Sequence, residues 1–334
     1  MSIGHLSPSI PVPDAEVAAG TAFALLVELA AASADRNGRA PELQAALDAV
    51  GDTAGESWLN LLGIPIDSGP PYEAERLHAR VAQIDPLELR RHLLGRYAWS
   101  WCTLAGADTI EQAADGDTKA VRALLKHDRY YAGQAKAALS TLAVLDPEET
   151  RRRIAHALDV GARALNLASE PIERAASEAS AALESEPLSE AIERLTAGYR
   201  YVPEIEAQGV LLVPHLQGRP WLVLAQHRGT RVIVYRATGA DDVEERATAL
   251  GRALADAKRV EILKLLASGI ERVSDLVSET GLTRSTVHHH LSQLREAHLV
   301  DLEGNARAYR YRLRREAHDE TVDLLSALLG ERPT

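Results

Sequence analysis

The feature that most constrains the fold of this chain lies between residues 246 and 313, where helix, turn and strand signals follow one another closely. Three segments with apolar residues at helical spacing lead to Gly281, and the next helical segment, RSTVHHHLSQLREA, begins three residues later. Two short strand-like runs, LVDL and AYRYRL, then flank the sequence EGNAR. A winged helix-turn-helix has the order helix, tight glycine-containing turn, second helix and β-hairpin, so we expect that fold here.

The region before residue 200 is predicted to be helical. Apolar residues recur at helical spacing from Asp14 to Ala197, and Asp85-Pro86 and Asp146-Pro147 each indicate an N-cap followed by proline at the first helical position. Three β-rich runs follow, GVLLVPH, PWLVLAQH and TRVIVYRA, with short glycine-containing turns between them. This pattern predicts an antiparallel three-stranded meander.

The expected fold class is therefore mainly α with a small β part. At 334 residues the chain is longer than a single hydrophobic core usually supports, so more than one domain is expected. The domains we predict are a helical regulatory or sensor region at 1–200, an antiparallel β-meander at 201–242 that belongs to the N-terminal half, and a winged helix-turn-helix domain at 243–334 that ends in an amphipathic helix.

Composition narrows the class of protein. An apolar fraction of 46% and a charged fraction of 25% are those of a soluble globular chain. The single cysteine, Cys102, excludes an intramolecular disulfide framework and a zinc cluster of thiolates. No signal peptide is recognisable at the start, and the alanine-rich run around Glu28 is too weakly apolar for a membrane span. We therefore expect a cytoplasmic protein with no membrane partner.

The distribution of charge separates the C-terminal domain from the rest. The net charge is −11, but residues 251–316 carry twelve Lys/Arg against nine Asp/Glu, whereas the remainder carries 25 against 39. A mildly basic module on an acidic body is a weak pointer to phosphate contact.

The run ALADAKRVEILKLLASGIERVSDLVSETGLTRSTVHHHLSQLREAHLV, with the closing YRYRL, resembles the DNA-binding domain of the ArsR-type winged-helix transcriptional regulators. The resemblance covers roughly residues 246–330, and residues 1–240 contain no motif of comparable specificity. It implies a sequence-specific DNA-binding regulator of the repressor kind, not an enzyme, that binds a double-stranded DNA operator as a homodimer. The alternatives are an enzyme or an architectural scaffold protein that uses a winged helix for tethering.

Two departures from the family pattern bear on metals and on one turn. Metal-sensing members carry Cys-x-Cys where this chain has Arg272 and Ser274, and the C-terminal helix places leucines where a second metal site needs histidine. We therefore expect neither a metal nor another cofactor. His298 stands where relatives have a helix-ending glycine, so it is expected to adopt the left-handed conformation.

The three adjacent histidines fall on different faces of the second helix. Successive residues are about 100° apart, so one metal ion cannot bind all three. The helical wheel places Val287, Leu291 and Leu294 toward the domain core and makes His290 a packed, hydrogen-bonded scaffold residue. The residues expected to contact DNA from the start of this helix are Thr283, Arg284, Ser285, His288 and His289. A solvated helix face is the alternative.

The hairpin supplies the predicted wing. Arg307 at its tip is the candidate for a phosphate or minor-groove contact, and Arg310 is a further DNA-binding candidate. Tyr309, Tyr311 and Leu313 alternate to the other face and are expected to pack inward.

Two further surfaces are predicted outside the DNA-binding face. By resemblance, the homodimer forms through the first and last helices of the domain, here at Leu254, Val322, Leu325 and Leu328. Packing of the last helix on the N-terminal half is the alternative. The aromatic residues Tyr97, Trp99 and Trp101, and the pair Tyr130-Tyr131, suggest a pocket for an unknown small-molecule effector or else an aromatic core.

Overall fold

The computed structural model describes residues 12–34, 39–51, 56–126, 135–165, 167–216, 222–237, 243–305 and 308–330. Two compact units divide the chain. The first, here called the body, comprises Asp14–Ser180 and Glu206–Arg236. The second, here called the winged-helix unit, comprises Ala181–Ile205 and Ala237–Thr334 together with Met1–Pro13.

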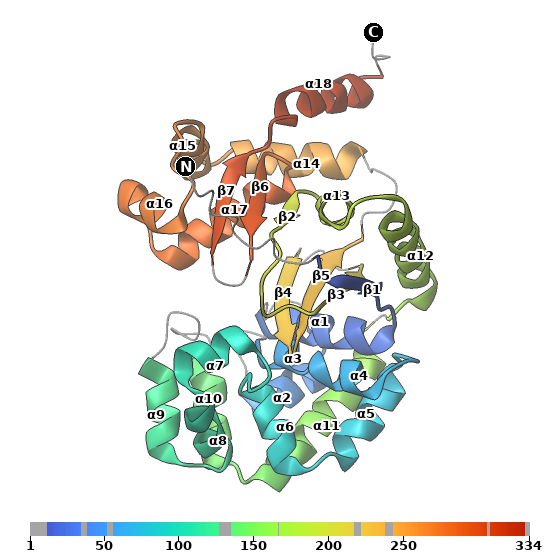
Figure 1. The fold of residues 1–334 in the computed structure, drawn as a ribbon, viewed down its shortest axis with the longest axis vertical. Coiled ribbons are helices and arrows are strands. Elements are labelled where there is room, and N and C mark those ends of the chain that lie inside the picture. The colour runs from blue at the N-terminus through green and yellow to red at the C-terminus, as the bar shows by residue number, and fades with distance from the viewer. Residues whose placement is uncertain are drawn as a thin grey trace, which may run out of the picture. The chain divides into compact units, whose positions relative to one another are not determined.

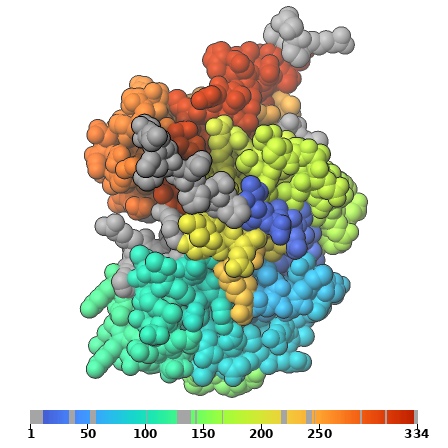
Figure 2. Space-filling model, in the orientation of Figure 1, coloured from blue at the N-terminus to red at the C-terminus, as the bar shows by residue number. Residues whose placement is uncertain are grey.

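The body is mainly helical, as expected (Figure 1). Its helices are α1 (Thr21–Ala34), α2 (Pro41–Val50), α3 (Glu56–Asn60), α4 (Gly63–Ser68), α5 (Ala74–Gln83), α6 (Pro86–Leu93), α7 (Trp99–Ala105), α8 (Ala107–Ala114), α9 (Thr118–Lys126), α10 (Ala135–Val144), α11 (Pro147–Ala164) and the start of α12 (Ser169–Ser185). In Figure 2 the segment from α4 to α9, light blue to teal, forms one closely packed surface.

Local sequence explains where several of these helices begin and how closely they pack. The Asp85 side chain accepts hydrogen bonds from the first turn of α6, and Asp146 does the same for α11, so both predicted N-caps are confirmed. Gly161 on α11 lies against α1, and a Cβ at this position would be 2.8 Å from Cδ2 of Leu29. Glycine therefore sets the distance between these two core helices.

The body sheet corrects the predicted meander. Its strands are β1 (Asp14–Val17), β3 (Gly209–His215), β5 (Thr230–Arg236) and β4 (Leu222–His227), in that spatial order. β3 pairs in parallel with both β1 and β5, and only β4 and β5 form an antiparallel hairpin. The continuous apolar runs of β3 and β5 are typical of central strands buried on both faces, whereas β4 is half-buried along most of its length and lies at the edge. The strand positions were therefore right and the order was wrong.

The first strand is a second correction, because helical spacing was expected from Asp14 onward. Residues Asp14–Val17 instead form β1, which adds to the free edge of β3. Its four residues are too few to reveal alternation, and the strand depends on its neighbour for its hydrogen bonds.

The winged-helix unit contains the predicted helices and hairpin together with an additional strand. Its elements are α13 (Leu188–Leu195), β2 (Tyr199–Tyr201), α14 (Val243–Leu254), α15 (Ala257–Ala267), α16 (Val273–Thr280), α17 (Arg284–Glu296), β6 (Val300–Gly304), β7 (Tyr309–Leu313) and α18 (Ala317–Leu328). β2 pairs in parallel with β6, so the hairpin sheet has the order β2-β6-β7. The upstream segment that carries α13 and β2 therefore belongs to this unit, a grouping that the sequence pattern did not indicate.

Across the described ranges, no helix is long and apolar enough to cross a membrane.

Candidate nucleic-acid interface

The turn between α16 and α17 positions the start of α17. Gly281 ends α16 with φ of +68°, and its N–H donates to the carbonyl of Val277 at 3.1 Å. A Cβ at Gly281 would meet no atom within 4 Å, so glycine is favoured here by its backbone conformation and not by lack of space. Thr283 then caps α17, because its hydroxyl oxygen accepts the backbone N–H of Thr286 at 3.2 Å.

The core face of α17 agrees with the helical wheel. Val287, Leu291 and Leu294 are fully buried, as expected. His290 is also buried, which confirms that it is packed, but its Nδ1 has no hydrogen-bond partner in the described part of the chain, so the expected hydrogen bond at that atom is not found. Burial lowers the pKa of His290, and Asp256 opposes the change.

The flank of α17 that carries His288 lies against the first residue of β7. The Tyr309 hydroxyl is 3.4 Å from Nε2 of His288 and 3.4 Å from Nη2 of Arg284. His288 is half-buried, and its pKa is lowered by burial first and by the Arg284 charge second. The imidazole is therefore neutral at neutral pH.

The exposed side chains at the start of α17 are those of Thr283, Arg284 and His289. Ser285 lies within α17, but its side chain is outside the described residues, as is Arg307 of the wing. Three of the seven predicted DNA contacts therefore have exposed side chains.

The wing arginines are engaged with carboxylates. Arg312 Nε lies 2.8 Å from Glu271 Oε1, and its Nη1 lies 2.9 Å from Glu303 Oε2. Arg310 forms an ion pair with Glu303, and its Nη1 lies 3.6 Å from Glu271 Oε2. These four residues, here called the wing ion-pair square, join β6, β7 and the segment before α16, where the Tyr311 N–H donates to the Glu271 carbonyl. Arg310 would have to exchange a carboxylate for a phosphate to bind DNA.

The other face of β7 is only partly buried, which corrects one expectation. Tyr311 is 9% exposed, but Tyr309 and Leu313 are 37% and 38% exposed. The reason is that a two-residue period identifies a common face of a strand but not how far the neighbouring helix covers it. Only the middle residue is enclosed.

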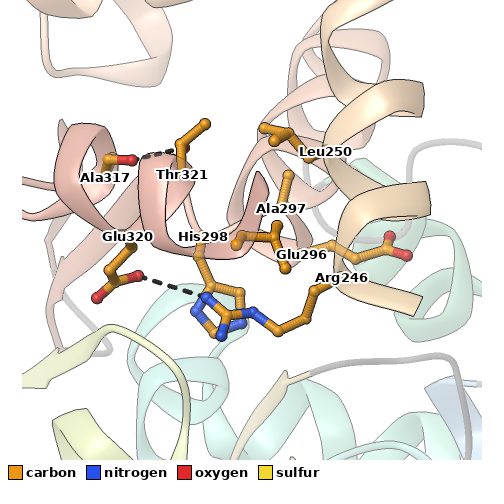
Figure 3. A pocket seen from close by; sticks show the side chains of 9 residues that line it. Arg246, Leu250, Glu296, Ala297, His298, Ala317, Glu320 and Thr321 are labelled. Atoms are coloured by element: carbon orange, nitrogen blue, oxygen red, sulfur yellow. Dashed lines mark hydrogen bonds and ion pairs between the residues drawn. The ribbon is translucent and has the colours of Figure 1, made fainter. Parts of the chain in front are cut away.

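His298 ends α17 as expected, with φ of +55°. The N–H groups of His298 and Leu299 donate to the carbonyls of Arg295 and Leu294, at 2.9 Å and 3.0 Å. Figure 3 shows His298 with Glu320 of α18 and Arg246 of α14. Arg314 Nη1 lies 3.4 Å from His298 Nδ1, and Arg314 Nη2 donates to Glu320 Oε1 at 2.9 Å. These polar contacts join the end of α17 to α18. The depression lined by Arg246, His298 and Glu320 has a volume of about 10 Å³, enough for about one water molecule.

The predicted dimer residues are accessible on the single chain. Leu254, Val322, Leu325 and Leu328 are all exposed, whereas Leu324 of α18, four residues before Leu328, is buried. α18 contacts α14 within the unit. An exposed apolar stripe therefore remains on α18 after its intramolecular packing.

The three aromatic residues of the proposed effector pocket are packed in the body. Trp101 belongs to the hydrophobic core, the Arg231 guanidinium lies 5.2 Å from the Trp99 ring, and the Arg228 guanidinium lies 4.6 Å from the Tyr97 ring. Tyr130 and Tyr131 lie outside the described residues. A depression elsewhere in the body, near Glu28 and Ile172, has a volume of about 20 Å³.

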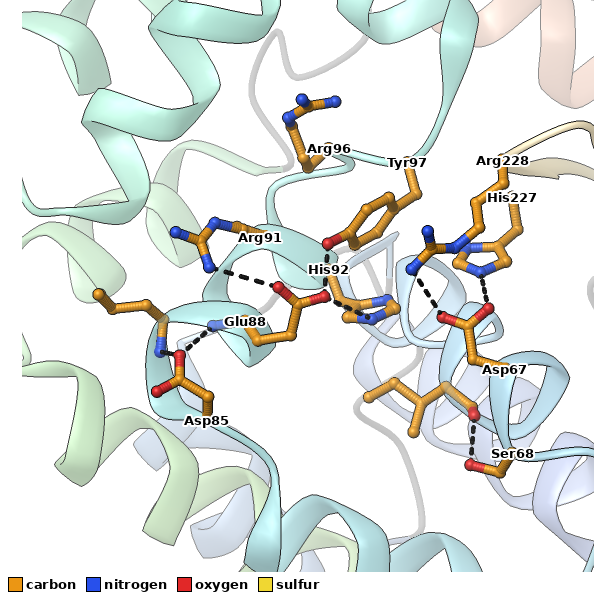
Figure 4. A network of polar contacts seen from close by, with 12 residues as sticks. Asp67, Ser68, Asp85, Glu88, Arg91, His92, Arg96, Tyr97, His227 and Arg228 are labelled. Carbon is orange, nitrogen blue, oxygen red and sulfur yellow. Dashed lines mark hydrogen bonds and ion pairs between the residues drawn. The ribbon is translucent and has the colours of Figure 1, made fainter.

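A polar network that the sequence did not reveal lies beside this aromatic cluster (Figure 4). Asp67 Oδ1 is 2.7 Å from His227 Nε2, and the His227 ring stacks on that of His92 with a centroid distance of 5.7 Å. The Tyr97 hydroxyl donates to Glu88. Burial lowers the pKa of both histidines, that of His92 to about 4. Asp67 and His227 are 160 residues apart in the chain, so no local spacing could have predicted their contact.

The positions of Ser68 and His227 make this network a poor catalytic site. The Ser68 hydroxyl donates to the carbonyl of Ile64, and a Cβ at Gly63 would lie 2.2 Å from His227 Nδ1. The second nitrogen of the imidazole is therefore covered by backbone and cannot reach a nucleophile or substrate. Among the described residues no group of three or more His, Cys, Asp or Glu could hold a metal ion.

Comparisons with known proteins concern the C-terminal region. Residues 256–301 match the family model described as bacterial regulatory protein, arsR family. A stretch of 64 residues is 47% identical to the HTH-type transcriptional regulator CmtR of Mycobacterium tuberculosis and of Mycobacterium bovis, and covers 19% of this chain and 54% of the relative. The chain thus spans about half the length of the curated relatives it matches. No solved structure matches the chain.

Proposed function

We propose that this chain, whose C-terminal region carries an ArsR-type helix-turn-helix domain, is a sequence-specific DNA-binding transcriptional regulator that acts as a repressor. The observation that carries the proposal is the exposed N-terminal half of α17, where Thr283, Arg284 and His289 each have an exposed side chain. In a helix-turn-helix this part of the second helix enters the major groove.

The residue types suit this role. Arg284 can donate two hydrogen bonds to a guanine, and a histidine can contact a base edge or a phosphate oxygen. Ser285 and His288 complete the proposed reading set on the helix, while Arg307 and Arg310 are the proposed wing contacts. Each base-edge contact discriminates between sequences by roughly 1–3 kcal/mol, whereas phosphate contacts act nearly equally on all sequences.

Homodimerisation is part of the proposal. The exposed residues Leu254, Val322, Leu325 and Leu328 would pair with the same residues of a second copy, because a twofold contact is self-complementary. Two copies of α17 would then read two half-sites about one helical turn apart.

The body is the proposed sensor of an unknown effector, with Tyr97, Trp99 and Trp101 as the candidate pocket. One observation favours a scaffold role instead, since the depression of the body near Glu28 has room for about one or two water molecules. A drug-sized ligand needs roughly 300–1,000 Å³, so this depression could hold one only after a conformational change.

Selection of bound fragments from genomic DNA tests the function. The wild type should enrich one sequence with two related half-sites, and Arg284→Ala and His289→Ala should reduce that enrichment. Arg174→Ala, which removes an exposed arginine on α12, is the matched control and should bind like the wild type. Equal recovery of all fragments by the wild type would favour the architectural alternative.

A further inference from the structure

Tyr309, at the start of β7, contacts two predicted reading residues at once. Its hydroxyl lies 3.4 Å from Nη2 of Arg284 and 3.4 Å from Nε2 of His288, which are four residues apart on the same flank of α17. The Tyr309 and His288 ring centroids are 6.0 Å apart. The hydroxyl is therefore a shared hydrogen-bonding point for both side chains.

We propose that Tyr309 is a positioning residue that fixes the tautomer and orientation of His288 for reading a hydrogen-bond acceptor on DNA. This inference rests on the proposed function and deepens it. The guanidinium of Arg284 can only donate, so the Tyr309 oxygen accepts from Arg284. In the arrangement that we propose, the Tyr309 O–H is the donor to His288 Nε2, which leaves no donor of this group without an acceptor. A neutral imidazole whose Nε2 accepts carries its proton on Nδ1.

This arrangement predicts what His288 recognises. The Nδ1–H is the donor that remains for DNA, so its partner must be an acceptor, such as N7 of a purine, O6 of guanine or O4 of thymine in the major groove. Cytosine presents only an amino donor there and would be rejected. A histidine without the Tyr309 hydroxyl could switch tautomers and accept either pattern.

The environment of His288 supports the neutral form. Burial and the positive charge of Arg284 both lower its pKa, and no acidic residue acts on it within the described part of the chain. The Tyr309 hydroxyl adds a donor to Nε2, which also favours the unprotonated ring.

The strand that carries Tyr309 is held in place from three sides. Tyr309 is paired with Gly304 of β6, the wing ion-pair square fixes the opposite face of β7, and Tyr311 anchors the strand in the core. Tyr309 itself is 37% exposed, and its ring packs edge-on against that of Tyr311, with the centroids 6.2 Å apart. Packing accounts for the ring but not for the hydroxyl, which contacts Arg284 and His288.

Tyr309→Phe tests the inference because it removes only the hydroxyl. The probes are the duplex that the wild type enriches from a random-sequence pool and a shuffled duplex of the same length. Loss of a hydrogen bond of ordinary strength should weaken binding to the enriched duplex about three- to tenfold and leave the shuffled duplex nearly unaffected. Tyr72→Phe, the same chemical change in the body, should alter neither.

Nitrogen-15 spectra of the imidazoles give a readout that packing alone would not move. In the wild type His288 should be protonated on Nδ1, and in Tyr309→Phe it should become a mixture of tautomers with a higher pKa. In a double-mutant cycle, His288→Ala should abolish the effect of Tyr309→Phe on the enriched duplex.

The outcomes separate this inference from the proposed function. If the wild type enriches no duplex, the proposed function fails and the inference falls with it. If the wild type enriches a duplex and Tyr309→Phe keeps the same ratio of enriched to shuffled binding, or keeps the tautomer of His288, the inference alone is overturned.

Discussion

At the scale of single residues, burial decides what the histidines of this chain can do. His92 is 3% exposed in the body, and its pKa is lowered to about 4, first by burial and then by the neighbouring His227. His288, on the flank of α17, shows a lowered pKa for the same leading reason. These imidazoles are neutral at neutral pH, so each acts as a hydrogen-bonding ring and not as a cation.

His92 should make the stability of the body depend on pH. In the unfolded chain a histidine takes up a proton near pH 6.5, whereas His92 in the fold does so only near pH 4. The stability that follows from its neutral form is thus complete above pH 6.5 and is lost as the pH falls toward 4, by at most about 3 kcal/mol. Urea unfolding at several pH values should show this loss in the wild type.

The variant His92→Gln identifies the residue responsible. Its free energy of unfolding should fall less steeply between pH 7 and pH 4.5 than that of the wild type. His156→Gln, at an exposed histidine on α11, is the control and should leave the slope unchanged. Parallel slopes for the wild type and His92→Gln would show that the predicted origin of the pH dependence is wrong.

At the scale of elements, the sequence predicted where helices and strands occur better than it predicted which elements contact one another. The 3.6-residue period located α17 and its buried face, because that face depends on spacing within one helix. It could not show which flank β7 covers, because the contact of Tyr309 with His288 depends on residues 21 apart in the chain. The predicted order of β3, β4 and β5 was wrong for the same reason, because the pairing of strands depends on residues far apart in the chain.

The wing ion-pair square should limit the electrostatic attraction of the wing for DNA. Glu303 binds both Arg310 and Arg312, so Glu303→Gln removes one carboxylate and weakens the hold on both arginines. We expect Glu303→Gln to bind a shuffled duplex more tightly and with a steeper dependence on salt, because more cations then contact phosphates. Titrations at several salt concentrations measure both effects.

A control variant must separate the effect of losing one negative charge from the effect of losing it at the wing. Asp323→Asn removes one negative charge from an exposed position on α18 and is the control. It should change the salt dependence less than Glu303→Gln does. Equal effects of the two variants would mean that net charge, and not the ion-pair square, controls the attraction.

At the scale of the whole molecule, the surface of α18 is where a second copy would bind. Val322, Leu325 and Leu328 form an exposed apolar stripe, while the neighbouring Leu324 is buried within the unit. Sequence spacing predicted the stripe, but it could not show that these residues stay exposed after the chain folds. Exposed apolar residues in a row are costly to hydrate, and pairing with the same stripe removes them from water.

Leu325→Glu should therefore convert the proposed dimer into a monomer, because pairing would bury two carboxylates against each other. Val144→Glu makes the same change at an exposed apolar residue on α10 of the body and is the control. Mass measured by light scattering at micromolar concentration should halve only in Leu325→Glu. Binding to a duplex with two half-sites should then weaken strongly, while binding to a single half-site should stay near that of the wild type, because α17 and the wing remain intact. A dimeric Leu325→Glu, or a monomeric wild type that binds two half-sites with full affinity, would place the partner surface elsewhere.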